Sequence, residues 1–136
     1  HGWTYSAHPL CAAAGVANLE VIDELGLVEN AAKVGEWFRR RLTDALSDHR
    51  HVGEVRGDGM LAAVEFVEDK DDAKFFDPSQ KVGPRIAAAL AERGVIGRAM
   101  PQSDTLGFAP PLCMTNREAD IVVNATVEAV EAVFPS

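Results

Sequence analysis

The sequence predicts an α+β fold, in which helices pack on one side of a small, mainly antiparallel sheet. Three observations lead to this prediction: a long stretch with an apolar residue every three or four positions, a hairpin signal around an Asp-Gly pair, and a capping box before a valine-rich stretch. In chain order the expected elements are helix, helix, hairpin, helix, strand, strand and helix. The 136 residues fit one domain or a part of a larger one.

Two helices are predicted in the first third of the chain. The first begins at Pro9, because a proline at the first helical position gives up no helical hydrogen bond, and it stops at Gly26. The second covers residues 27–46 and carries one apolar stripe at helical spacing. This stripe consists of Leu27, Ala31, Val34, Phe38, Leu42 and Leu46. The three arginines at 39–41 fall mostly off the stripe, so we expect them on a solvated face.

A β-hairpin is predicted next. Residues 52–56 and 60–67 flank the sequence Gly57-Asp58-Gly59, and an Asp-Gly pair supplies the positive φ angles that a tight turn needs. The charged run at residues 68–72 lacks the spacing of a calcium-binding loop. It is therefore expected to be an exposed loop.

The remaining elements are a helix, two strands and a last helix. Asp77-Pro78 is typical of a helix start, and the face formed by Val82, Ile86 and Leu90 runs to a stop at Gly94. Strands are predicted at residues 95–99 and 105–109. The last helix begins with the capping box Thr115 to Glu118. Its apolar residues are Val122, Val123, Val127, Val130 and Phe134.

Composition excludes some classes of function. The net charge of −8, from 13 basic and 21 acidic residues, disfavours nucleic acid or an anionic membrane as partner. Cys11 and Cys113 lie in apolar surroundings without a CxxC spacing, which predicts small buried thiols in a reducing, cytoplasmic compartment. No histidine has metal-ligand spacing, and His49 and His51 are expected at the surface. From the residues alone, the prediction goes no further than a soluble α+β domain.

A family resemblance adds to this reading. The sequence resembles the C-terminal part of class III pyridoxal-phosphate-dependent aminotransferases, the ω-transaminase group. The matching stretches are HGWTYSAHPLCAAAGVANLEVI, VGEVRGDGMLAAVEFV, RGVIGRAM and LGFAPPLCMTNREAD. The stretch GVIGRAMPQSDTLGFAPPL is most similar to members that use pyruvate as amino acceptor, while Ala7 stands where the family usually has glycine.

The resemblance implies a fold-type-I enzyme, in which a large cofactor domain precedes a small C-terminal domain. Residues 1–26 would be the interface and cofactor-phosphate segment with its connecting helix, and residues 27–136 the small domain. Family members are dimers with active sites shared across the interface. The parent protein would use pyridoxal 5′-phosphate to move an amino group from an amine or ω-amino acid to a keto acid such as pyruvate. His1 is interpreted as an internal residue of that longer protein.

Thr4 matches the family residue whose hydroxyl contacts the cofactor phosphate of the neighbouring subunit. A dianionic phosphate needs several convergent neutral donors, and a threonine hydroxyl in a fixed turn is one of them. By the same resemblance, Trp3 contributes a backbone donor and one wall of the pocket, and Tyr5 is a further candidate in that turn. The alternative is that Thr4 and Ser6 merely cap the helix that begins near Pro9.

Arg98 matches the family arginine that pairs with a substrate carboxylate and swings away for amines that lack one. A guanidinium suits this role because its planar fork binds a carboxylate through two parallel hydrogen bonds. Gly97 and Ala99 are expected to leave room for the movement, and Met100 with the loop 101–105 to shape the pocket entrance. The alternative is an ordinary surface ion pair. Arg56 is interpreted as structural.

No catalytic residue and no metal ligand is expected in this chain. Transamination needs a Schiff-base lysine, which in the family lies upstream of the matched segment. None of Lys33, Lys70, Lys74 and Lys81 has the strand-end context of that lysine. We therefore expect that the chain alone neither holds the cofactor covalently nor turns over. Two alternatives stay open: a non-catalytic α+β ligand-binding or interaction module, and a class III enzyme acting as racemase, aminomutase or decarboxylase.

Overall fold

The computed structural model describes residues 2–101 and 104–135, and it confirms an α+β fold. His1, residues 102–103 of the predicted entrance loop, and Ser136 lie outside this description. The elements are α1 (Pro9–Glu24), α2 (Leu27–Leu46), β1 (Val52–Asp58), β2 (Leu61–Phe66), the 3₁₀ helix η1 (Pro78–Gln80), α3 (Val82–Glu92), β3 (Arg98–Ala99), β4 (Thr105–Phe108) and α4 (Asn116–Val133).

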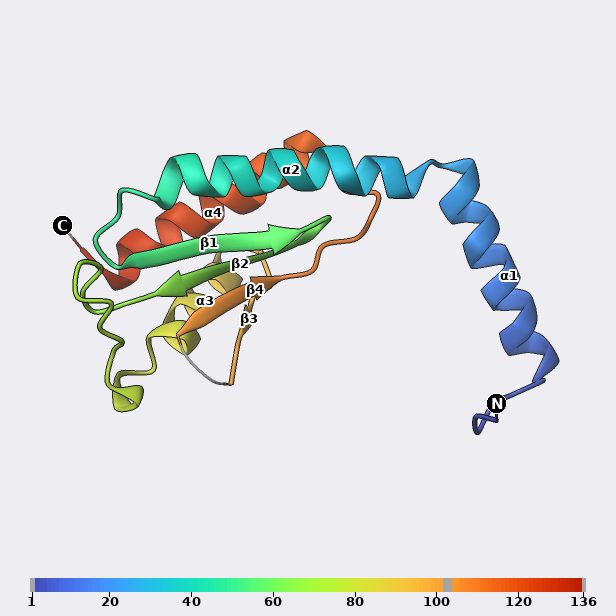
Figure 1. Ribbon diagram of the computed structural model, residues 1–136, viewed down its shortest axis with the longest axis horizontal. Helices are drawn as coiled ribbons and strands as arrows, with labels where there is room; N and C mark the ends of the chain where they lie inside the picture. The colour runs from blue at the N-terminus through green and yellow to red at the C-terminus, as the bar shows by residue number, and fades with distance from the viewer. Residues whose placement is uncertain (1, 102–103, 136) are drawn as a thin grey trace.

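The strands form one antiparallel sheet in the order β1-β2-β4-β3, with α2, α3 and α4 packed together against it (Figure 1). Side chains alternate along β2: Ala62, Val64 and Phe66 are buried against the helices, whereas the residues between them are more exposed. Alternation of this kind is expected of a sheet with one covered face. The predicted arrangement, with helices on one side of a mainly antiparallel sheet, is confirmed.

Helix α2 has the predicted bounds, and its apolar stripe lies in the core apart from the half-buried Leu27. Gly35 allows the helix to approach the hairpin at backbone distance, because a Cβ there would collide with the carbonyl of Gly59. Arg39 donates a hydrogen bond to that same carbonyl, and Arg41 pairs with Asp120 of α4 at 3.1 Å. The predicted solvated face is thus only partly correct, since two of the three arginines join elements.

The hairpin exists, but its turn lies one residue later than predicted. Asp58 pairs with Leu61, so Gly59 and Met60 form the turn. Gly59 takes the positive φ, +50°, and its N–H donates to the Asp58 carboxylate at 2.9 Å. Met60 is buried beneath the turn, because its side chain belongs to the core. Asp58 therefore stabilises the turn by accepting a hydrogen bond at its carboxylate, and its own backbone is not left-handed.

The predicted start of the third helix, Pro78, is wrong by four residues, because α3 begins at Val82. Asp77 caps only the single turn η1, accepting from the N–H of Ser79 at 2.8 Å. Lys81 then takes a left-handed conformation, with φ +48°, which separates η1 from α3 and changes the direction of the chain between them. The first turn of α3 is closed by Asp104, whose carboxylate accepts from the N–H of Gly83 at 2.8 Å. A carboxylate 21 residues away thus replaces the local cap that the sequence suggested.

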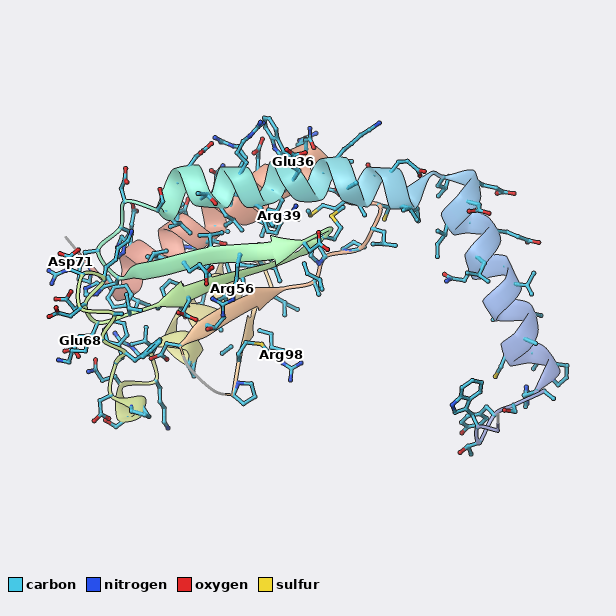
Figure 2. The ribbon with its side chains drawn as sticks, in the orientation of Figure 1. Glu36, Arg39, Arg56, Glu68, Asp71 and Arg98 are labelled. Carbon is cyan, nitrogen blue, oxygen red and sulfur yellow. The ribbon has the colours of Figure 1, made fainter. Side chains whose placement is uncertain are left out.

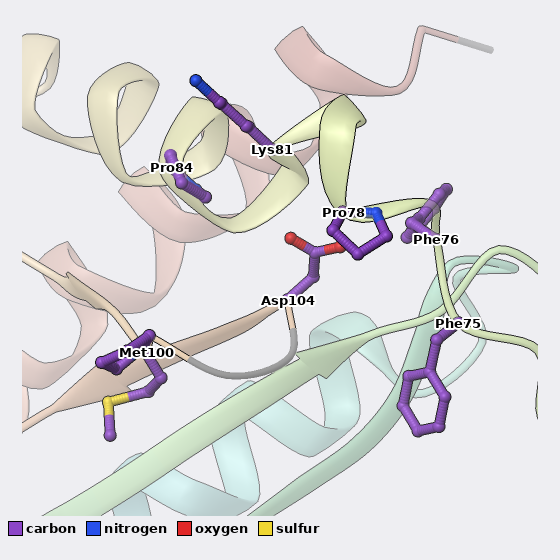
Figure 3. A pocket seen from close by; sticks show the side chains of 8 residues that line it. Phe75, Phe76, Pro78, Lys81, Pro84, Met100 and Asp104 are labelled. Carbon is purple, nitrogen blue, oxygen red and sulfur yellow. The ribbon is translucent and has the colours of Figure 1, made fainter.

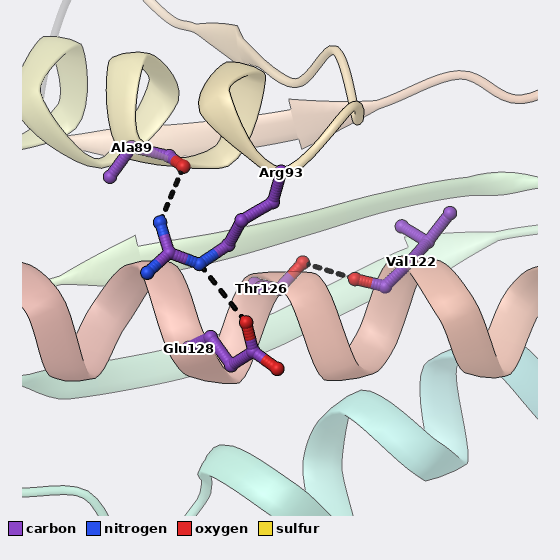
Figure 4. A network of polar contacts seen from close by, with 5 residues as sticks. All are labelled: Ala89, Arg93, Val122, Thr126 and Glu128. Carbon is purple, nitrogen blue, oxygen red and sulfur yellow. Dashed lines mark hydrogen bonds and ion pairs between the residues drawn. The ribbon is translucent and has the colours of Figure 1, made fainter.

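The C-terminal helix confirms its predicted capping box. Thr115 accepts from the N–H of Glu118, and the Glu118 carboxylate accepts from the N–H of Thr115 at 2.8 Å. Further along, Arg93 at the end of α3 bonds both to the Ala89 carbonyl at 2.7 Å and to Glu128 of α4 at 3.2 Å (Figure 4). This contact fixes α3 against α4 beneath the sheet.

Helix α1 projects away from the rest of the molecule, as Figure 1 shows. None of its residues is buried. Cys11 on α1 and Cys113 after β4 are exposed, so the prediction of buried thiols is wrong. Their apolar neighbours in sequence suggested burial, but α1 has no buried residue, and at the second site it is Met114 beside Cys113 that is buried. No described helix is long and apolar enough to cross a membrane.

Candidate functional site

The N-terminal segment forms a compact polar turn ahead of α1. The N–H of Trp3 donates to the Ser6 hydroxyl at 2.8 Å, and the N–H of Ser6 donates to the Trp3 carbonyl at 2.9 Å. Ala7 follows in a left-handed conformation with φ +60°, a geometry that favours glycine. The α1 N-cap residue, His8, makes no side-chain cap hydrogen bond. Ser6 therefore closes its own turn, and the expected alternative of a helix cap is not what this segment forms.

Thr4 is exposed, and its hydroxyl bonds to no other described residue. Trp3 and Tyr5 on either side are also largely exposed, at 78% and 74%. Thr4 thus carries a hydroxyl without a described partner in a hydrogen-bonded turn, between two exposed aromatic side chains. These are suitable groups for a phosphate.

The second candidate region is the sheet face that no helix covers. Cross-strand register places Arg56, Ala63, Gly107 and Arg98 in one row across the four strands. Because side chains alternate between faces, all four lie on the open face. The two central members, Ala63 and Gly107, have almost no side chain. They form the floor of a shallow groove that has an arginine at each edge. The groove above this floor has a volume of about 810 Å³.

The two arginines of the row differ in their partners. Nη1 of Arg56 lies 2.8 Å from a Glu54 carboxylate oxygen and 3.0 Å from one of Glu65. Arg98 is exposed and enters no ion pair with the described residues. The ordinary surface ion pair expected as the alternative for Arg98 is instead what Arg56 makes. Figure 2 shows both side chains on the open side of the sheet.

Ile96, Arg98 and Met100 alternate along the edge segment, and all three line the groove. Ile96 is 91% exposed, and the Met100 sulfur lies 3.4 Å from the place of a Cβ on Gly107, so it covers part of the floor. Apolar side chains therefore flank the guanidinium on both sides. The period-two pattern around Arg98 was visible in the sequence, whereas the floor residues Ala63 and Gly107 required the register.

The expectation that Gly97 leaves room for Arg98 to move is wrong. A Cβ on Gly97 would lie 2.8 Å from Leu90 Cδ2 and 2.9 Å from Leu106 Cδ1, so its small size serves packing against the core. Ala99 likewise lies opposite Leu106, on the core face. Freedom for Arg98 comes instead from its position, since β3 is a two-residue edge strand paired only with β4.

A second hollow, of about 750 Å³, adjoins the groove at Met100 (Figure 3). Its lining is mostly apolar: Phe75, Phe76, Pro78, Pro84, Met100 and Pro101, with Lys81 and Asp104 as the charged members. The Asp104 carboxylate is already used to close α3. The hollow therefore offers less directed chemistry than the groove around Arg98.

The structure does not bring the two candidate regions together. The turn that carries Thr4 lies at the far end of α1, well away from the Arg98 groove (Figure 2). The lysines lie on α2, in the loop between β2 and η1, and before α3, so among the described residues none sits at the end of a strand. The Lys74 ammonium pairs with Glu68 at 2.8 Å, and Lys70 donates to the Ser47 carbonyl.

Comparison with known proteins decides the family. The family model for class-III aminotransferases matches residues 1–130. The chain belongs to the class-III aminotransferase family. It is 53% identical, over 133 residues, to the diaminobutyrate--2-oxoglutarate transaminase of Halomonas elongata, covering 98% of this chain and 28% of that protein.

Solved structures of aminotransferases agree in fold. A transaminase from a study of directed evolution by ancestral reconstruction superposes with a TM-score of 0.94 at 56% identity, covering 98% of this chain and 29% of its own. An (S)-enantioselective omega-transaminase from Thermomicrobium roseum superposes with a TM-score of 0.90 at 37% identity, and the match covers 98% of this chain and 29% of that one. This class-III aminotransferase chain thus spans less than a third of the relatives that it matches.

Proposed function

We propose that the chain is the C-terminal portion of a pyridoxal-phosphate-dependent aminotransferase that moves an amino group from an amine or ω-amino acid to a keto acid such as pyruvate. Residues 27–136 form its small domain, and residues 1–26 contribute the phosphate segment and the connecting helix. The observation that carries this proposal is Arg98, a guanidinium without a carboxylate partner in an open, apolar-flanked groove. The bound cofactor would supply the electron sink and carry the amino group.

Arg98 binds the carboxylate of the acceptor. An arginine without an ion-pair partner at the rim of a groove can accept a bidentate carboxylate without first breaking another pair. Ile96 and Met100 beside it offer apolar contact to substrates that lack a carboxylate. An amine donor and a keto acid can therefore use the same groove in turn, with the guanidinium on its weakly held edge strand adjusting between them.

Thr4 and Trp3 contribute to the phosphate site of a neighbouring subunit. The hydroxyl of Thr4 is exposed in a turn that its own hydrogen bonds fix, which fits a donor to an external anion. The distance of this turn from the Arg98 groove supports a site assembled from more than one chain segment or subunit. The full-length protein is accordingly a homodimer or a higher homo-oligomer, and its cofactor is not held covalently by this portion.

A second acceptor is suggested by one relative. The transaminase of Halomonas elongata is named for diaminobutyrate and 2-oxoglutarate. A dicarboxylate has a second charge to place, but Arg56 at the opposite edge of the row is already neutralised by Glu54 and Glu65. The groove residues of this chain therefore favour an acceptor with one carboxylate, such as pyruvate, unless the rest of the protein supplies another cation.

Incubation of the full-length protein with pyridoxal phosphate, an amine donor and either pyruvate or 2-oxoglutarate tests the function. We expect alanine to accumulate from pyruvate, in step with loss of the donor amine. Racemisation or decarboxylation of an amino acid without amino transfer would instead identify a different class III reaction. A protein that binds no cofactor and transfers no amino group would indicate a non-catalytic module.

A further inference from the structure

A cluster of four rings lies at the end of the domain away from α1. It brings together His49 and His51 before β1, Phe76 before η1, and Phe134 after α4. The His51 ring lies 4.4 Å from that of Phe134 and 5.4 Å from that of Phe76, and the His49 ring lies 5.8 Å from Phe134. The prediction that both histidines are surface residues is only partly correct, because both are half-buried in this cluster.

Hydrogen bonds assign a proton state to each ring. His49 Nδ1 lies 3.1 Å from the backbone N–H of His51, so this nitrogen must accept and carries no proton. His51 Nδ1 lies 3.1 Å from the Val67 carbonyl, so this nitrogen must donate. Protonation of His49 at Nδ1 would replace its acceptor with a second donor facing the same N–H. The hydrogen bonds of the loop therefore require a neutral His49 ring whose Nδ1 carries no proton.

The charges around His49 come from three segments. Its own loop contributes Asp48, Arg50 and His51, α4 contributes Glu131, and the loop after β2 contributes Lys70, which donates to the Ser47 carbonyl. Burial lowers the pKa of His49 below its usual 6.5; His51 and Arg50 act in the same direction, and Glu131 opposes them. The one nearby carboxylate on α4 thus does not outweigh the effects that keep the ring neutral.

We propose that His49, with His51, is a proton-sensitive latch that holds the end of α4 and the loop between β2 and η1 onto the start of β1. In the neutral state, the hydrogen bond from His51 to His49 keeps both imidazoles stacked against Phe134 and Phe76. Once His49 is protonated, this bond is lost and the ring carries a charge 5.8 Å from a second imidazole. The latch then opens locally, while the sheet and the α2–α4 core stay folded.

Opening would reach the neighbourhood of the substrate groove. Phe76 belongs both to the ring cluster and to the wall of the hollow that adjoins the groove at Met100. Release of Phe76 therefore loosens a wall of that hollow. The sign follows from linkage: because the folded pKa lies below the unfolded one, the stabilisation is complete above about pH 6.5 and decreases as the pH falls toward the folded value.

Hydrogen exchange of the full-length protein between pH 8 and pH 5, expressed as protection relative to the intrinsic rate at each pH, tests the latch. We expect protection of residues 47–51, 67–76 and 131–135 to fall several-fold at pH 5, because protonation of His49 removes the hydrogen bond from the His51 N–H that holds the latch closed. Protection of residues 61–66 in β2 should stay constant. A uniform fall across β2 and the latch would show global destabilisation and overturn the proposal.

A substitution separates the latch from other acid effects. His49→Asn keeps an acceptor for the His51 N–H but cannot be protonated, so protection of the three segments should become independent of pH in this range. Unchanged pH dependence in H49N overturns the proposal. If H49N does not fold, NMR titration of His49 in the wild-type protein decides the matter, because a native pKa at or above 6.5 contradicts the latch and a lower one supports it.

Discussion

Thr4, Arg56 and Arg98 show how far single residues can be interpreted without coordinates. The residue types indicated the chemistry of an anion site, because a hydroxyl and a guanidinium both bind anions. Their partners could not be predicted, since these depend on register. The pairing of β1 with β2 sets Glu54 opposite Glu65, with Arg56 beside them. Arg98 lies on β3, two strands from β2, and has no carboxylate partner among the described residues.

At this scale, Thr4→Ala tests the phosphate site. Loss of one hydroxyl donor to a dianion should weaken cofactor binding by about 1.5–3 kcal/mol, or roughly 10- to 150-fold in the cofactor dissociation constant. Titration of the full-length apoprotein with pyridoxal phosphate measures it. Thr43→Ala, at an exposed position on α2, is the matched control and should leave the affinity unchanged. Equal affinity of the T4A variant and the wild type would reject the role of Thr4.

Elements with a strong periodic signal were predicted well. The bounds of α2 and the capping box of α4 were correct, because an amphipathic stripe and a reciprocal cap are both local. The start of α3 was missed because its first turn is closed by Asp104, which is distant in sequence. The edge strand β3 is shorter than predicted because only two of its residues find a partner on β4.

Thr115→Ala tests the cap at the element scale. Loss of an N-cap hydroxyl should lower the free energy of unfolding by about 1 kcal/mol at neutral pH. The hydrogen bonds with the backbone N–H and hydroxyl of Thr115 lower the pKa of Glu118 below its usual 4.5. The contribution of the Glu118 carboxylate to the free energy of unfolding is thus complete above pH 4.5, and it decreases as the pH falls through the pKa of Glu118 in the folded state. Urea unfolding at pH 7 and pH 3 should therefore show a smaller difference between variant and wild type at pH 3, and an equal difference at both would count against the capping box.

On the scale of the whole molecule, one sheet face is closed by helices and the other carries the groove. The order of the elements and the apolar stripes of the helices predicted the closed face, and the alternating burial along β2 agrees with it. They could not predict the groove, because Ala63 and Gly107 have no chemistry of their own and matter only as the floor between two arginines. Helix α1, with no buried residue, extends away from this body and carries the Thr4 turn to a separate place.

The most direct measurement of the central claim is the acceptor preference of Arg98→Ala in the full-length protein. We compare kcat/KM for pyruvate with kcat/KM for an aldehyde of similar size that lacks a carboxylate, and use Arg117→Ala, an exposed arginine on α4, as the control for loss of charge. If Arg98 binds the acceptor carboxylate, pyruvate should lose about 10- to 150-fold while the aldehyde changes little, as expected for a charged hydrogen-bonded pair. Equal losses for pyruvate and the aldehyde would contradict the assignment.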